Sequence, residues 1–142
     1  MKRLFIFLSA ILFILVLVGC CDCRKRAKLE KPLVGTEWQL VQIMGRDTHA
    51  EGDKFTLLLH DNGTVTGMGE CNRLTATYSV TPSRSLSFTN LATTRVYCPN
   101  YEAENAFLNM IESVTHYEMD AESMILLSNG TLVAIMRPKN LQ

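Results

Sequence analysis

The spacing of apolar residues changes along the chain and divides it into an apolar leader, two sets of short strands and one helix. Residues 4–18 are apolar except for Ser9. Further on, apolar residues form short runs or alternate with polar ones, which is typical of β-strands, but from Asn100 to Val114 they recur at helical spacing. The predicted strands cover residues 36–43, 55–60, 64–68, 74–81, 86–88, 116–119, 124–128 and 131–136.

Two Asn-Gly pairs, Asn62-Gly63 and Asn129-Gly130, each separate two predicted strands and predict tight hairpins. Both residues of each pair are expected to have positive φ. The run 55–60 is expected to be buried on both faces, because apolar residues occupy both sets of alternating positions. The two hairpin sequences are similar, which could reflect two similar halves, although shared turn chemistry explains the similarity as well.

The helix is predicted at about residues 101–114, with Asn100 as its N-cap and two glutamates in its first turn, where the helix dipole favours acids. Antiparallel strands with short links and a single helix predict a mainly β fold. We therefore expect a small, highly curved antiparallel sheet or barrel of about seven to eight strands, with the helix packed on it or plugging one end. A barrel of that size holds its own side chains or one small ligand.

The leader has the form of an export signal. Lys2 and Arg3 precede fifteen residues that reach about 22 Å as a helix, short of the roughly 30 Å of bilayer hydrocarbon. The run ends in Leu17-Val18-Gly19-Cys20, which resembles the lipobox of bacterial lipoproteins. This resemblance implies cleavage after Gly19 and lipid on Cys20, and so a signal peptide (1–19), a lipidated tether (20–32) and a domain (33–138).

An uncleaved transmembrane helix is the alternative for the leader, and Arg24-Lys25-Arg26 gives it some support, since positive charges usually mark the cytoplasmic flank. The basic stretch has two further interpretations: attraction to anionic lipid headgroups or a plain spacer. Residues 32–142 contain 7 basic and 12 acidic residues, although the whole chain is formally neutral. An acidic domain argues against nucleic acid as a partner, because nucleic-acid binding needs a basic face.

Two of the five cysteines, Cys71 and Cys98, lie in the predicted domain, whereas Cys20, Cys21 and Cys23 lie next to the lipobox cleavage site. An even pair in a small exported domain predicts a disulfide. That bond would gather polar residues from two connecting segments. The predicted polar cluster consists of Asn72, Arg73, Thr94 and Arg95. It would act either as a structural hydrogen-bond network, with an arginine paired to an acid, or as a binding site.

Motifs of catalysis and metal binding are not evident. The three histidines fall in separate segments, no Gly-x-Ser-x-Gly is present, and no zinc-ligand spacing occurs. We therefore expect no catalytic residues, no metal and no cofactor. Gly67-Met68-Gly69 resembles part of a phosphate loop, but no helix is predicted to follow it. The two glycines are instead expected to allow a bulge or a close backbone approach.

Several short motifs occur in order over about three quarters of the chain. They are Leu33-Val34-Gly35-Thr36-Glu37-Trp38-Gln39-Leu40, Asn62-Gly63, Gly67, Gly69-Glu70-Cys71-Asn72-Arg73, Tyr78, Leu86-Ser87-Phe88, Thr94-Arg95-Val96-Tyr97-Cys98, Glu104-Asn105-Ala106-Phe107-Leu108, Val114–Tyr117 and Asn129-Gly130. Together they resemble the META domain family, the HslJ-like lipoproteins of the bacterial envelope. The resemblance implies a small β-rich exported domain, associated in some members with stress or drug tolerance, and brings no enzymatic activity. Glu70, directly before Cys71, departs from the family pattern.

These observations lead to one main functional expectation. The chain is expected to be a non-enzymatic lipoprotein of the bacterial envelope that contacts the membrane through lipid on Cys20 and binds an unidentified envelope protein. Cys21 in place of an aspartate after the lipidated cysteine favours the outer membrane, with the domain facing the periplasm. A carrier of a small apolar ligand inside the barrel is the alternative, and an inhibitor of a hydrolase is a third possibility.

Overall fold

A computed structural model describes residues 31–120 and 122–139. The predicted signal peptide, the lipidation site Cys20 and most of the tether lie outside these residues. Within the described part of the chain, no helix is long and apolar enough to cross a membrane. The described residues form one antiparallel sheet of nine strands and one helix, so the predicted mainly β fold is confirmed.

The helix, α3, spans Tyr101–Ser113, close to its predicted range. Asn100 occupies the N-cap position, but its side chain makes no capping hydrogen bond. All eight predicted strand segments are present. The strands are β1 (Glu37–Ile43), β2 (Arg46–Asp47), β3 (Thr56–Leu59), β4 (Thr64–Met68), β5 (Arg73–Val80), β6 (Leu86–Thr93), β7 (His116–Met119), β8 (Met124–Ser128) and β9 (Thr131–Pro138).

Two features of the strands were not predicted. The strand β2 has only two residues, which is too short for a periodic pattern, and it exists because Gln42 and Ile43 of β1 pair with it. The strand β6 continues past residue 88 to Thr93, although most of that extension is polar and exposed. Its pairing with β5, which includes Leu74 opposite Thr93, accounts for the added length.

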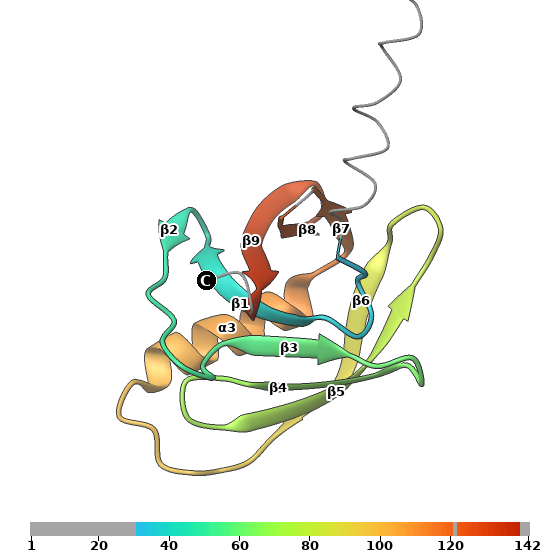
Figure 1. The fold of residues 1–142 in the computed structure, drawn as a ribbon. Helices are drawn as coiled ribbons and strands as arrows, with labels where there is room; N and C mark the ends of the chain where they lie inside the picture. The colour runs from blue at the N-terminus through green and yellow to red at the C-terminus, as the bar shows by residue number, and fades with distance from the viewer. Residues whose placement is uncertain (1–30, 121, 140–142) are drawn as a thin grey trace, which may run out of the picture. The chain divides into compact units, whose positions relative to one another are not determined.

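The strands follow the order β6-β5-β4-β3-β1-β9-β8-β7, and β2 pairs with β1 beside this path. The sheet is strongly curled, and its two edge strands touch at one end only, where Ser85 and His116 form an isolated bridge. The predicted curved sheet is therefore confirmed, but the sheet does not close into a barrel. Figure 1 shows α3 lying across the sheet behind β1 and β3, in the chain between β6 and β7.

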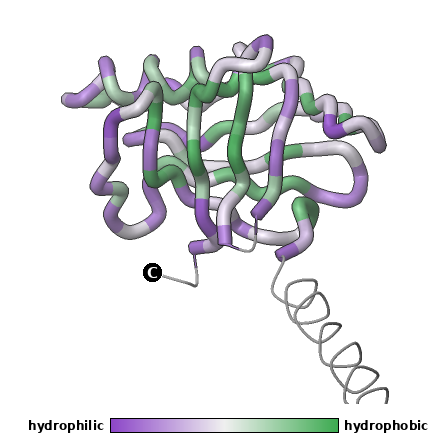
Figure 2. Tube along the Cα trace, turned by 90° about the horizontal axis from the view of Figure 1, so that it is seen from above, coloured by the Kyte–Doolittle hydropathy of each residue, from purple (hydrophilic) through white to green (hydrophobic). Residues whose placement is uncertain are grey.

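The concave side of the sheet is filled by side chains from α3. Phe107, Met110 and Ile111 are wholly buried, and the ring of Phe107 packs edge to face on Phe55 with centroids 5.3 Å apart. Hydrophobic residues lie along the middle of the strands and hydrophilic ones gather in the turns (Figure 2). Fully burying a phenylalanine, methionine or isoleucine side chain contributes about 1.5–3 kcal/mol to the stability of the fold. The largest fully buried side chains on the strands are those of Trp38, Leu40, Leu57, Leu59, Leu74, Leu86, Met124, Leu126 and Met136.

The two Asn-Gly turns differ in geometry. Asn129 and Gly130 both have positive φ (49° and 82°), as predicted. At the other hairpin only Gly63 is left-handed, with φ of 80°, so the prediction for Asn62 is wrong. His60 donates its backbone N–H to the carbonyl of Thr64 at 2.8 Å, which leaves a loop of three residues. A three-residue loop needs the left-handed conformation only at its last position.

Candidate functional site

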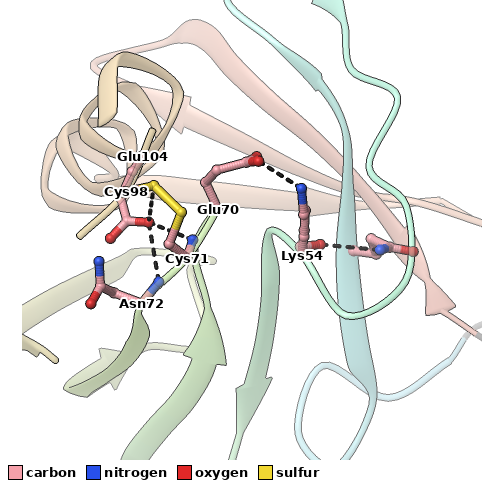
Figure 3. Close-up of polar contacts among 7 residues, drawn as sticks. Lys54, Glu70, Cys71, Asn72, Cys98 and Glu104 are labelled. Carbon is pink, nitrogen blue, oxygen red and sulfur yellow. Dashed lines mark hydrogen bonds and ion pairs between the residues drawn. A yellow bond between two sulfur atoms is a disulfide. The ribbon is translucent and has the colours of Figure 1, made fainter. Parts of the chain in front are cut away.

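A disulfide joins two connecting segments that are distant in sequence. Cys71 lies in the loop between β4 and β5, and Cys98 lies in the connection from β6 to α3. Their Cα atoms are 5.6 Å apart, within the usual range for a disulfide (Figure 3). The bond therefore ties a loop of the sheet to the segment that leads into the helix.

A buried carboxylate supports the same loop. One oxygen of Glu104, Oε2, accepts hydrogen bonds from the backbone N–H groups of Cys71 at 2.7 Å and Asn72 at 3.2 Å (Figure 3). The same oxygen lies 3.7 Å from Sγ of Cys98, a contact without a hydrogen bond, because a disulfide sulfur carries no proton. Glu104 thus satisfies two donors of the disulfide loop from the first turn of α3.

From the sequence, Glu104 was expected only to interact favourably with the helix dipole in the first turn of α3. Its hydrogen bonds to the distant β4–β5 loop were not predicted. A signal was available, because position 104 lies three residues before Phe107 and seven before Ile111. These spacings put the glutamate on the apolar face of the helix. A carboxylate on a buried face needs hydrogen-bond partners, which here come from the sheet.

The glycines of the predicted close approach lie beside these contacts. A Cβ atom at Gly67 would lie 2.1 Å from the carbonyl oxygen of Thr56, and one at Gly69 would lie 3.1 Å from Oε2 of Glu104. Gly67 therefore has no room for a side chain, as the close-approach interpretation predicted, whereas at Gly69 a Cβ atom would be tight against the end of the Glu104 side chain. The absence of a side chain at Gly69 leaves room for the carboxylate.

Of the predicted polar cluster, Asn72 and Thr94 form a hydrogen-bond network. The side chain of Asn72 is nearly buried, and its Oδ1 accepts from the backbone N–H of Val96 at 2.7 Å and from the hydroxyl of Thr94 at 2.9 Å. Its Nδ2 donates to the carbonyl of Val96 at 3.2 Å. The Asn72 side chain therefore binds residues 94–96 through hydrogen bonds much like those of a neighbouring strand. This favours the structural interpretation for Asn72 and Thr94.

The two arginines of the cluster behave differently. Arg73 joins it only through its backbone, whose N–H donates to Oγ1 of Thr94 at 3.2 Å. Both Arg73 and Arg95 are exposed, and within residues 31–120 and 122–139 neither has a carboxylate within 4.0 Å. The expected arginine–acid pair is not present there, since the ion pairs of the described residues are all made by lysines.

The segment from Thr94 to Tyr101, which we call the tyrosine loop, carries large exposed side chains. Val96 is 62% exposed, Tyr97 86% and Tyr101 60%. The backbone beneath them is fixed by the Cys98 disulfide and by the bonds of Val96 to Asn72. Sequence reasoning did not single out the two tyrosines, although aromatic residues on either side of a cysteine and outside the strand pattern were a signal.

A groove of about 360 Å³ lies beside the start of α3. Lys54 and Glu70 form an ion pair of 2.6 Å among its lining residues, so the glutamate that departs from the family pattern has a partner (Figure 3). The remaining lining residues come from β1, the segment after β2 and the helix. They are Leu40, Ile43, Thr48, His49, Glu51, Phe55, Asn100, Ala103 and Ala106.

Among residues 31–120 and 122–139, three groups have pKa values that depart from the usual ones, and each has a clear cause. A hydrogen bond from Lys139 lowers the pKa of Asp53, and hydrogen bonds to Asp53 and Glu37 raise the pKa of Lys139. Burial raises the pKa of Tyr78, whose hydroxyl donates to the carbonyl of His60 at 2.8 Å. The hydrogen bond of Tyr78 joins β5 to the residue after β3, and the contacts of Lys139 join the end of the domain to β1 and to the segment before β3.

Comparison with solved structures supports the fold. The chain is similar to an NMR structure of a protein from Burkholderia xenovorans, with 27% identity, a TM-score of 0.58, and coverage of 75% of this chain and 83% of that one. It is also similar to the crystal structure of a DUF4847 family protein from Bacteroides vulgatus ATCC 8482, with 15% identity, a TM-score of 0.56, and coverage of 77% and 95%. At that lower identity the likeness shows the fold alone.

The family assignment comes from sequence. No functionally curated protein matches the chain. The family model of the META domain matches residues 31–140, which is most of the chain and all of the curled sheet with its helix. META is not a known enzyme family. The resemblance carried by the ordered motifs is thereby confirmed, and the chain belongs to the META domain family.

Proposed function

We propose that this chain is a non-enzymatic lipoprotein of the bacterial envelope whose META domain binds another envelope protein through the tyrosine loop. The lipobox-like Leu17-Val18-Gly19-Cys20 supports attachment through Cys20. The role is that of an accessory module under envelope stress or drug exposure, located on the outer membrane and facing the periplasm. Membership of a family that is not known for enzymes supports the non-enzymatic part of the proposal.

The observation that carries the interaction role is the exposure of Tyr97 and Tyr101 on a fixed backbone. Tyrosine and arginine are enriched among the residues that dominate protein–protein binding energy. Here Tyr97 is 86% exposed and lies two residues from the exposed Arg95. The disulfide and the hydrogen bonds to Asn72 restrain the backbone of the loop, which lowers the ordering entropy that binding costs.

The interior of the sheet offers less support for a carrier of an apolar ligand. The side chains of Phe107, Met110 and Ile111 occupy the concave side, where such a ligand would have to lie. The groove beside α3 is lined by charged residues such as Glu51 and Lys54 as well as apolar ones. Neither the concave side of the sheet nor this groove therefore offers a buried apolar space for a ligand among the described residues.

The loop is tested by site-specific photo-cross-linking in intact cells. A photoreactive amino acid at position 97 should give a reproducible adduct with one envelope protein. The matched control is position 132, where Leu132 is also exposed (39%) but lies on β9. Adducts of equal pattern at both positions, or only with abundant bystanders, would contradict the proposed surface.

The anchor is tested separately by metabolic labelling with a clickable fatty acid. The wild-type chain should carry the label and fractionate with the outer membrane, and Cys20→Ala should lose the label. Cys21→Ala is the control and should keep it. Label retained by Cys20→Ala would mean that lipid is attached elsewhere. Absence of label from the wild type as well as from Cys20→Ala would favour the uncleaved transmembrane helix.

A further inference from the structure

We propose that Cys71, Cys98 and Glu104 form a binding site for one thiophilic divalent cation, such as Zn²⁺, when the disulfide is reduced. The cation would then replace the disulfide as the link between the β4–β5 loop and α3. This inference concerns the disulfide loop itself and does not depend on the proposed partner.

The positions of the three ligand atoms suit such an ion. One atom from each of Cys71, Cys98 and Glu104 lies within 4.8 Å of the others, and Oε2 of Glu104 is 3.7 Å from Sγ of Cys98. In a tetrahedral zinc site, Zn–S bonds of about 2.3 Å and Zn–O bonds of about 2.0–2.2 Å separate sulfur and oxygen by roughly 3.5 Å. The observed separation of Oε2 from Sγ of Cys98 is close to this value, and the two sulfurs must move apart once the bond between them is broken.

The carboxylate is already held in place by hydrogen bonds from outside the ligand set. The N–H groups of Cys71 and Asn72 both donate to Oε2 of Glu104. Each carboxylate oxygen has two lone-pair positions, so the two donors occupy those of Oε2 and leave those of Oε1 for a metal bond. Carboxylates that bind metals are usually fixed by hydrogen bonds of this kind. Glu104 therefore resembles a preorganised ligand.

The chemistry of the exchange is balanced. A two-electron reductant, a dithiol protein in the same compartment as the domain, converts the disulfide into two thiols and is itself oxidised to a disulfide. Binding of the cation then releases the two thiol protons, because thiolates are the ligands. Two thiolates and a carboxylate supply three protein ligands, which leaves a fourth position for water or a small ligand.

The test uses the full chain with Cys20, Cys21 and Cys23 changed to serine, so that the domain's two cysteines are its only thiols. The protein is reduced with a phosphine and titrated with Cd²⁺, whose bonds to thiolates give an ultraviolet charge-transfer band. The reduced protein should saturate at one Cd²⁺ per chain, and a large excess of Zn²⁺ should displace the Cd²⁺, since thiolates favour the softer Cd²⁺. The oxidised protein should give no band.

Matched variants separate the carboxylate from the thiols. Glu104→Gln should weaken Cd²⁺ binding by at least about tenfold, as expected for a lost ligand. Glu102→Gln is the control, because Glu102 lies in the same helical turn but is exposed, and it should bind like the parent. Cys71→Ser should lose the saturable band. Equal affinity in Glu104→Gln and Glu102→Gln would overturn the proposed site.

A second measurement keeps the test decisive if reduction loosens the fold. The single tryptophan, Trp38, is buried in the core, so its fluorescence reports folding. Zn²⁺ should raise the unfolding temperature of the reduced parent and raise that of reduced Glu104→Gln by clearly less, because the weaker binding stabilises the folded state less. If the reduced chain is unfolded and its Trp38 fluorescence does not change when Cd²⁺ binds, the two thiols bind the metal without forming the folded site. That result would refute the proposal.

Discussion

The two ends of α3 are held by different means. At its start, the segment from Thr94 to Asn100 belongs to no strand or helix, and the disulfide of Cys98 and the amide of Asn72 hold it, while the carboxylate of Glu104 binds the neighbouring loop at Cys71 and Asn72. At its end, a link of two residues leads into β7, and backbone bonds dominate. Thr115 donates its N–H to the carbonyl of Leu127 at 2.8 Å and accepts at its own carbonyl from Leu86 at 3.0 Å.

This difference has consequences for robustness and for function. Every residue except proline carries a backbone donor and acceptor, so backbone contacts survive most substitutions. The contacts at the start of α3 require particular side chains, and a single change removes them. In return, a segment fixed by its own few side chains can expose others, and Tyr97 and Tyr101 are exposed there.

The largest effect is expected from the disulfide. Replacing both Cys71 and Cys98 by serine should lower the free energy of unfolding by about 2–5 kcal/mol, since the bond closes a long loop. Urea denaturation followed by Trp38 fluorescence measures the change. Cys23→Ser, outside the domain, is the control. A loss below about 1 kcal/mol would mean that the side-chain bonds alone hold this end of the helix.

The second effect is expected from the buried carboxylate. Glu104→Leu keeps the bulk but leaves the N–H groups of Cys71 and Asn72 without their acceptor, which costs about 1–3 kcal/mol. Glu112→Leu on the same helix is exposed and should change stability by less than about 0.5 kcal/mol. Equal urea midpoints for Glu104→Leu and Glu112→Leu would mean that the Glu104 carboxylate does not stabilise the start of α3.

A smaller effect is expected at the other end of the helix. Thr115→Val removes a hydroxyl that accepts from the N–H of Asn129 at 2.8 Å, but it leaves the backbone bonds of residue 115 intact. The loss should be about 0.5–1.5 kcal/mol, because Asn129 is exposed and water can replace the hydroxyl. Thermal denaturation of this variant beside Glu104→Leu compares the two ends directly, and a greater loss for Thr115→Val would reverse the comparison.

The smallest effect is expected from Lys139, which lies at neither end of α3 and provides a baseline. Lys139→Met removes its ion pairs with Asp53 and Glu37 at the surface, where such pairs contribute little. The lowered pKa of Asp53 means that its contribution is present above pH 3.8 and is lost as the pH falls through the folded value. The raised pKa of Lys139 means that its contribution is present below pH 10.5 and is lost as the pH rises further.

Urea midpoints of the parent and Lys139→Met should therefore differ most between pH 3.8 and 10.5 and converge outside that range. High salt should reduce the difference as well, because the two carboxylates are exposed to solvent. A difference that persists at pH 2 would indicate that the methylene chain of Lys139, and not its charge, makes the contribution.

The sequence by itself determined which segments are strands and which is the helix, because alternating and helical spacings are local and each spans only a few residues. It also singled out Cys71 and Cys98 and predicted a bulge or a close backbone approach at Gly67 and Gly69. The turn at Asn62-Gly63 was assigned the wrong geometry, because the number of loop residues depends on how His60 pairs with Thr64, and an Asn-Gly pair alone does not specify that.

Only the tertiary structure decided that β2 exists, that β6 continues to Thr93 and that the sheet curls without closing. It alone brought Glu104 to Cys71, across 33 positions of sequence, and Asn72 to Val96, across 24. The physical reason is that a hydrogen bond between distant residues leaves no period in the chain. Its partners are chosen when the sheet curls around α3 and the buried donors must find acceptors.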